Sequence, residues 1–462
     1  MTAPAQESTP LKRVMGPKLL LLFIIGDILG TGIYALTGQV AKEVGGAAWA
    51  PFLAAFIVAM MTALSYLELV TKYPRAAGAA LYVHKAFNVH FFTFIVCFTV
   101  MCSGLTSAST ASQAFAANLF AALGVDAGPG WVMLGAVGFM ALVMLVNLRG
   151  VSESVKANVV LTLVELSGLV MVIVLGFYAV GQGQADFSRV VAFDTPEDKS
   201  VFLAITSATA LAFFAMVGFE DSVNMAEETH QPHRIFPKVL LGGLGLTAVI
   251  YVLVSICAVA LIPVGELASS ATPLVLVVER AAPGLPMETI MPIISMFAVA
   301  NSALINMMMA SRLLYGMSRQ GVLPGFLARV HARTQTPWVA ILFTTALAVG
   351  LIVLVTAGTD SEAIRALGGT TALLLLGVFT CVNVAVLVLR RDRVAHPHFR
   401  TNGIVAALGA VTCLFLVTPL TGRDPIQYEV AGWLLALGVV MWGVTLLAGG
   451  RGMARMDPEE LE

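Results

Sequence analysis

A carboxylate and clustered glycines interrupt the first long apolar stretch of this chain. The stretch begins at Leu19, and the interruption reads Gly26-Asp27-Ile28-Leu29-Gly30-Thr31-Gly32. Glycine weakens a helix because it contributes no side-chain packing and loses the most backbone freedom on folding. Backbone groups freed at membrane depth persist only where protein, a watery cavity or a ligand satisfies them. The segment therefore predicts an opened helix and a binding site halfway across a bilayer.

Asp27 is the first residue of this segment that could do chemistry. It precedes Gly30 by about one helical turn and so lies on a similar face. An ionisable group in a membrane span is a candidate functional group, because leaving it unpaired is costly. Asp27 could hold a substrate amine, carry a proton, or cap the opened backbone, since Asp readily binds nearby N–H groups. The sequence leaves these roles open.

A second interruption lies in the sixth apolar stretch, five stretches after the first. It reads Ala212-Phe213-Phe214-Ala215-Met216-Val217-Gly218-Phe219-Glu220. Because five is odd, the first span rises while the sixth descends, so spans 1–5 and 6–10 would be inverted copies. Paired broken helices in such repeats place a substrate at the midplane, and rocking of one bundle gives alternating access. The alternative interpretation is that these glycines only permit close packing of helices. Two breaks at corresponding positions favour a substrate-binding site.

The two breaks together can replace water for both ends of a zwitterion. The half-helix after the first break presents free N–H groups and the positive end of its dipole, which suit a carboxylate. Carbonyl groups released at the second break suit an ammonium group. The predicted substrate-binding residues are Ile28, Gly30, Thr31, Gly32, Phe214, Ala215 and Val217.

The composition places both breaks in a polytopic membrane protein. Of the 462 residues, 58% are hydrophobic and 11% are charged, with a mean hydropathy of +0.90; about 25% charged residues is usual in soluble domains. Apolar runs long enough to cross about 30 Å of hydrocarbon recur along the chain. Twelve spans are predicted, at approximately 19–38, 48–71, 91–123, 130–147, 157–180, 201–226, 239–262, 288–316, 338–356, 367–389, 403–421 and 428–448.

The placement of basic residues predicts the orientation. With a cytoplasmic N-terminus, 20 of the 26 Lys and Arg residues fall in cytoplasmic segments and 6 outside, which satisfies the positive-inside rule. The predicted organisation is a cytoplasmic tail (1–18), a first repeat (19–180), a second repeat (201–391), two peripheral spans (402–448) and a cytoplasmic tail (449–462). The polar leader is not expected to be a cleaved signal.

Several classes of function are disfavoured by what the chain contains. The five cysteines lie in apolar spans without metal-ligand spacing, and we expect them to be small buried hydrophobic residues. The seven histidines lie in or beside loops, which argues against a metal site or a membrane enzyme. A nucleotide-binding Gly-x-x-x-x-Gly-Lys-Ser/Thr loop is absent from the sequence, which argues against an ATP motor. We expect a non-enzyme without metal, cofactor or nucleic acid.

Short motifs along the chain resemble those of the amino acid/polyamine/organocation superfamily. Gly30-Thr31-Gly32-Ile33 resembles its first-span signature. Further matching motifs are Tyr66-Leu67-Glu68-Leu69, Tyr73-Pro74-Arg75-Ala76-Ala77-Gly78, Gly218-Phe219-Glu220, Ala226-Glu227-Glu228, Pro232-His233-Arg234, Ser311-Arg312-Leu313-Leu314-Tyr315, Gly321-Val322-Leu323-Pro324 and Thr336-Pro337-Trp338. Gln320 departs from the pattern, since relatives often carry Asp there. The resemblance covers spans 1 through 9.

The resemblance implies an all-α membrane fold and roles for single residues. The fold is a leucine-transporter-like five-plus-five inverted repeat, with spans 1 and 6 broken and spans 11 and 12 peripheral. Phe214 matches a bulky aromatic that closes over substrate, whereas Phe213 is expected in the core. Glu220 matches an acidic position after the second break, which suggests gating or proton relay. Glu165 stands where some proton-coupled relatives place a lysine; it could exchange a proton, help to coordinate sodium, or make a structural hydrogen bond.

The function implied is secondary active transport of amino acids across the cytoplasmic membrane. We expect alternating access and proton-coupled uptake, with Asp27, Glu165 and Glu220 as coupling or gating groups and sodium as the alternative ion. An amino acid/amine exchanger or a transporter of polyamines or cationic amines is the second hypothesis. A channel or a membrane-embedded sensor is the third. The expected partners are a small amino acid or amine and the lipid bilayer.

Overall fold

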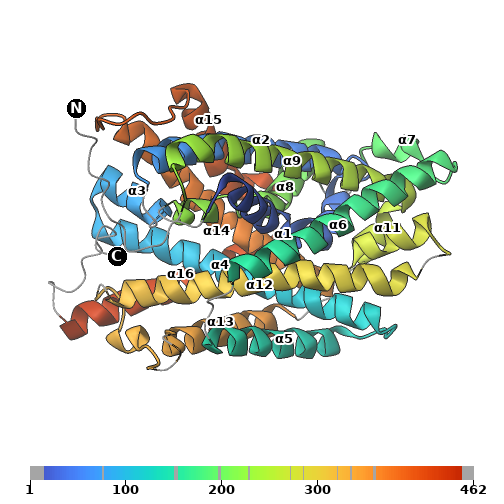
Figure 1. Ribbon diagram of the computed structural model, residues 1–462. Coiled ribbons are helices and arrows are strands. Elements are labelled where there is room, and N and C mark those ends of the chain that lie inside the picture. The colour runs from blue at the N-terminus through green and yellow to red at the C-terminus, as the bar shows by residue number, and fades with distance from the viewer. Residues whose placement is uncertain are drawn as a thin grey trace.

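Long helices make up most of the computed structural model (Figure 1). The structure describes residues 15–74, 78–149, 154–195, 199–226, 229–270, 272–284, 286–319, 321–332, 334, 336–356 and 360–449. Most of both predicted tails therefore lies outside the described residues. The same holds for Gln320, for Glu227-Glu228, and for residues 75–77 of the motif that begins at Tyr73.

Within the described residues, eleven helical segments are long and apolar enough to cross a membrane, and one further apolar helix is shorter. These spans are α1 (Pro17–Val44), α2 (Trp49–Lys72), α4 (His90–Ala122), α5 (Pro129–Arg149), α6 (Ser154–Gly181), α8 (Val201–Ala212) with the turns after it, α9 (Pro232–Leu261), α12 (Met287–Arg319), α13 (Trp338–Val355), α14 (Asp360–Leu389), the shorter α15 (Gly403–Val417) and α16 (Pro425–Gly449). The predicted twelve-span, all-α class is confirmed. The largest shifts in boundary occur at α9 and α14, which begin seven residues before the predicted spans.

Short helices connect the spans, and the hydropathy pattern did not predict them. They are α3 (Gly78–Phe87), α7 (Phe187–Val190), α10 (Val264–Ser269) and α11 (Pro273–Ala281), with 3-10 turns η1 (Phe213–Met216), η2 (Asp221–Met225), η3 (Gly325–Ala328) and η4 (Pro419–Thr421). Each α-helix of this set has 10 residues or fewer, so it is too short to stand out as a span. The predicted eleventh span, 403–421, ends its α-helix at Val417 and finishes in η4.

The first span, α1, lies inside the bundle. Every residue from Ile24 to Ala41 is buried, and α1 contacts α6, α8, α9 and α12. Figure 1 shows it in the middle of the bundle, between α9 and α12. A membrane helix that is buried on all sides cannot rely on lipid to tolerate an opened backbone, so neighbouring helices must satisfy its free groups.

The two ends of the bundle are held by different sets of polar contacts. We call them the Glu43 end, where α1 finishes and α8 begins, and the Arg390 end, where α2 and α14 finish. Lys199, just before α8, forms an ion pair with Glu43 at 2.6 Å. Because α1 starts at the Arg390 end and α8 starts at the Glu43 end, the two broken spans run in opposite directions.

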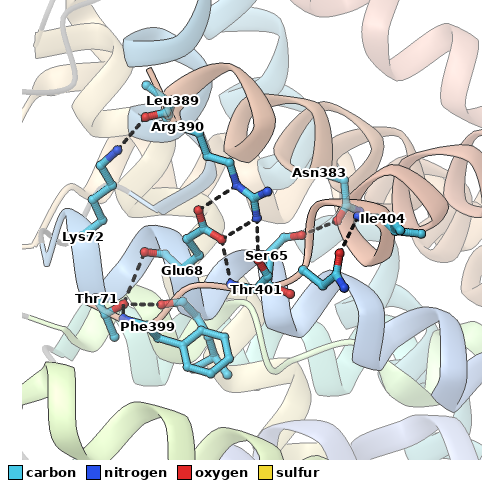
Figure 2. A network of polar contacts seen from close by, with 12 residues as sticks. Ser65, Glu68, Thr71, Lys72, Asn383, Leu389, Arg390, Phe399, Thr401 and Ile404 are labelled. Carbon is cyan, nitrogen blue, oxygen red and sulfur yellow. Dashed lines mark hydrogen bonds and ion pairs between the residues drawn. The ribbon is translucent and has the colours of Figure 1, made fainter. Parts of the chain in front are cut away.

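A buried network joins α2 to the end of α14 and the connection that follows it (Figure 2). The Glu68 carboxylate accepts hydrogen bonds from Arg390 Nε at 3.1 Å, Arg390 Nη2 at 3.0 Å and the backbone N–H of Thr401 at 2.8 Å. Lys72 Nζ donates to the backbone carbonyl of Leu389 at 2.5 Å. Glu68 is therefore fully paired at the edge of the bundle, away from the two breaks.

Candidate functional site

The first break lies within α1 at Gly30, whose backbone is non-helical (φ 14°, ψ −150°). The carbonyl groups of Ile28 and Leu29 lie directly before this break. The Tyr251 hydroxyl of α9 lies against them and donates at 2.6 Å to Ile28 and at 2.8 Å to Leu29. A neighbouring side chain thus satisfies the freed backbone, as membrane depth requires.

The second break follows α8, where the helix tightens to the single turn η1 and then opens. Val217 is extended (φ −79°, ψ 162°), and Gly218 has φ +114°. A Cβ at Gly218 would lie 2.7 Å from the backbone oxygen of Asp27, so both the dihedral and the close approach require glycine. One Glu220 carboxylate oxygen accepts the Gly218 N–H at 2.8 Å, and Glu220 therefore stabilises the opened backbone.

The two breaks line one cavity of about 70 Å³, room for several water molecules. Eight of the ten predicted site residues line it: Asp27, Ile28, Gly30, Thr31, Gly32, Phe214, Val217 and Glu220. Ala215 does not line the cavity; its backbone packs against Gly32. Glu165 also lies outside the lining.

Two polar groups on α1 face this cavity without a protein partner. Thr31 is 3% exposed and Asp27 is 9% exposed. Thr31 Oγ1 and Asp27 Oδ2 have no hydrogen-bond partner among the described residues. A buried polar group without a partner costs free energy, so both atoms are poised to bind what enters the cavity.

Phe213 and Phe214 lie in different surroundings although they are adjacent. Phe214 lines the cavity and packs against Gly368 of α14. Phe213 is fully buried and meets Phe379 edge-on, with ring centroids 5.9 Å apart. The position of Phe214 permits the predicted closing role, and Phe213 lies in the core.

Glu165 lies on α6, which packs along α1. Its side chain is fully buried, and neither carboxylate oxygen has a hydrogen-bond partner among the described residues. Its backbone carbonyl accepts the Tyr34 hydroxyl at 2.9 Å. Contacts of Thr162 with Gly26 and of Gly168 with Tyr34 place Glu165 alongside the broken part of α1.

Other helices complete the cavity. Ser103 and Ser107 of α4, with Ser302 and Asn306 of α12, line it. Two neighbours of these residues make hydrogen bonds between helices instead: Thr106 to Thr371, and Ser109 to the carbonyl of Ala348.

Several residues that line the cavity were not predicted from the sequence, among them Asp221, Ala79 and Ala80 of α3, and Cys97. Asp221 could have been found as a second carboxylate directly after the break. The alanines carried no chemical signal, because only the position of α3 brings them to the cavity.

Four of the five cysteines are buried and Cys381 is half-buried; all are free thiols.

Polar contacts hold the helices together at the Glu43 end of the bundle. The Glu43 side chain is 3% exposed and pairs with both Lys199 and Arg365, which links α1, the start of α8 and α14. Arg423, between α15 and α16, is buried and donates to the backbone carbonyls of Gly369 at 3.0 Å and Ala210 at 3.4 Å. Burial lowers the Arg423 pKa to about 10. These contacts join α8 to α14 on the side of the cavity that faces the Glu43 end.

The protein has a cavity between two broken helices in the middle of an apolar bundle. This arrangement is typical of integral, multi-pass membrane proteins that bind a small solute within the membrane. Residues 17–444 match the amino acid permease family, and the chain belongs to that family. It therefore has the all-helical, membrane-spanning fold of that family, and its general activity is amino acid transport.

Three curated relatives are named as permeases or transporters. The branched-chain amino acid permease BcaP of Bacillus subtilis is 28% identical over 94% of this chain and 92% of the relative. The methylthioribose transporter of the same organism is 25% identical over 94% of each chain. Cationic amino acid transporter 9 of Arabidopsis thaliana, a chloroplastic protein, is 29% identical over 70% of this chain and 58% of the relative.

Proposed function

We propose that this chain is a secondary active transporter that takes up amino acids across the cytoplasmic membrane by alternating access and proton coupling. The observation that carries the proposal is the single cavity lined by both breaks. Free N–H groups after Gly30 suit a substrate carboxylate, and the Thr31 hydroxyl adds a donor. Carbonyl groups around Phe214 and Val217 suit the ammonium group. No cofactor besides the coupling ion is required.

The polar contacts at the Glu43 end support a state in which the site communicates with the Arg390 end. Ala79, Ala80 and Leu313 extend the cavity lining in that direction. In the orientation predicted from basic residues, the Arg390 end and both termini are cytoplasmic. Rocking of the broken helices against the remaining spans would then open the Glu43 end and close the other.

Glu165 is the proposed coupling residue. A fully buried carboxylate without a partner is too costly to remain charged in isolation, so the side chain takes up a proton or a cation when the bundle closes around it. Asp27, which lines the cavity, is the rival carrier. Sodium remains the alternative ion, because both residues supply oxygen ligands. Glu220, bonded to Gly218, is assigned to gating of the second break.

Uptake by purified protein in proteoliposomes tests the proposal. The panel should include branched-chain, cationic and small neutral amino acids, together with methylthioribose, because the named substrates of the relatives differ. We expect saturable accumulation under an inward proton gradient and its collapse with a protonophore. Accumulation driven only by sodium would replace the ion, and non-saturable flux without counterflow would indicate a channel.

A further inference from the structure

The described walls of the cavity carry acidic side chains and no basic one. Three carboxyl groups line it, those of Asp27, Glu220 and Asp221. Among its described lining residues there is no Lys, Arg or His. A cavity with this composition favours a cation over a neutral or anionic solute, because ion–ion interactions strengthen where water is scarce.

Two other buried carboxylates of the described chain have basic partners. Glu43 pairs with Lys199 and Arg365, and Glu68 pairs with Arg390. Asp27, also nine-tenths buried, has an oxygen with no partner in the described part of the chain. Removing one member of a buried ion pair is strongly destabilising. The free oxygen of Asp27 is available to a cation that enters the cavity.

The three acids of the cavity are not equivalent. One oxygen of Glu220 is already engaged by the Gly218 N–H, and Asp221 lies at the half-buried edge of the cavity. Glu165 is unpaired but does not line the cavity. Asp27 is thus the carboxylate that a cation within the cavity would meet with an oxygen still free.

We infer that the cavity selects amino acids with a cationic side chain and that Asp27 is the specificity residue that binds this side-chain cation. The inference rests on the proposed function, which places the substrate carboxylate at Gly30–Gly32. Asp27 lies one helical turn before that point, toward the Arg390 end. The α-ammonium group binds the carbonyls of the second break, and the second positive group reaches Asp27.

Equilibrium binding to the purified full-length protein, without any ion gradient, separates specificity from coupling. Lysine and norleucine are the matched probes, since norleucine has the same carbon chain as lysine but carries hydrogen in place of the side-chain ammonium group. Cadaverine, which lacks the carboxylate, tests whether a diamine suffices. We expect lysine to bind at least about tenfold more tightly than norleucine, roughly 1.4 kcal/mol, and cadaverine to bind more weakly than lysine.

The Asp27→Asn variant should bring the lysine-to-norleucine affinity ratio close to one, whereas Asp27→Glu should keep lysine preferred. The matched control is Glu266→Gln, which alters a half-exposed carboxylate at the Glu43 end and should leave the ratio unchanged.

Equal affinities of wild type for both probes would overturn the inference. The inference would also be overturned if Asp27→Asn bound lysine and norleucine more weakly to the same extent. That result would assign Asp27 to the α-ammonium group. If wild type binds norleucine but not lysine, the cationic specificity fails while the proposed function stands; if no amino acid binds, both fail.

Discussion

Gly32 of α1 lies directly against the backbone of Ala215 in η1: a Cβ at Gly32 would come within 2.4 Å of the Ala215 Cα. The half-helix that offers N–H groups therefore touches the turn that offers carbonyls. Gly32→Ala should push the two breaks apart and weaken substrate binding at least about tenfold, because backbone cannot yield as a flexible side chain does.

Ligand-induced thermal stabilisation of the purified variants measures this effect. Gly138→Ala on the outer face of α5 is the matched control, because a Cβ there meets nothing within 4 Å. Both variants should insert and purify normally. Wild-type affinity in Gly32→Ala would mean that close contact of the breaks is not needed for binding.

Phe214 should close over bound substrate, since its ring lines the cavity and rests on Gly368. Phe214→Ala should raise the KM severalfold or make transport leaky, and Phe214→Trp should be tolerated better. Phe213→Ala should instead lower stability, by about 3–5 kcal/mol for a large core cavity, with little change in KM for the protein that folds. If Phe214→Ala and wild type have identical kinetics, Phe214 contributes only to packing and does not close over the substrate.

Glu165→Gln should uncouple transport from the proton gradient. The amide imitates the neutral carboxyl but cannot release a proton, so exchange of substrate should persist while pH-driven accumulation is lost. Comparison of counterflow with accumulation in the same proteoliposomes measures the difference. If Glu165→Gln accumulates substrate normally and Asp27→Asn does not, the coupling role passes to Asp27 and Glu165 is structural.

Glu43→Gln should loosen the closed end of the bundle. The change removes the acid that holds Lys199 and Arg365, and breaking a buried ion pair leaves uncompensated charge. The native thiol Cys97 lines the cavity and can report its accessibility. A membrane-impermeant thiol reagent added to intact cells should label Cys97 several times faster in Glu43→Gln than in wild type.

Two controls make the labelling experiment specific. Cys97→Ser should abolish the additional signal, and Glu266→Gln should leave the rate unchanged, because its pair with Arg280 is half-exposed and such pairs contribute little. Unchanged labelling in Glu43→Gln would show that packing alone keeps this end closed.

The sequence predicted the features that depend on composition along the chain. Apolar runs located the spans, and clustered glycine located the break at Gly30, because both signals are local. Eight of the ten site residues then line one cavity because they belong to two segments, the break of α1 and the turn after α8, that pack against each other.

Features that depend on distant partners could not be predicted in the same way. Nothing near Glu43 in the sequence indicates that it pairs with Arg365, 322 residues away. Nothing in the sequence around Tyr251 indicates that its hydroxyl donates hydrogen bonds to the carbonyls of Ile28 and Leu29. Conversely, Glu165 stood out correctly as a buried carboxylate, but its absence from the cavity lining required the packing of α6 against α1.

The eleventh span has a consequence for the surrounding lipid. Its helix, α15, has 15 residues and so rises about 22 Å, less than the roughly 30 Å of a hydrocarbon core. The turn that follows is protected because Thr421 and Arg423 are buried and Arg423 donates to the Leu416 carbonyl at 2.7 Å. Only the short turn η4 extends the span beyond α15, so the membrane is expected to adapt to the remaining mismatch. Acyl chains beside α15 are expected to be compressed, which makes this flank of the protein the one most sensitive to bilayer thickness.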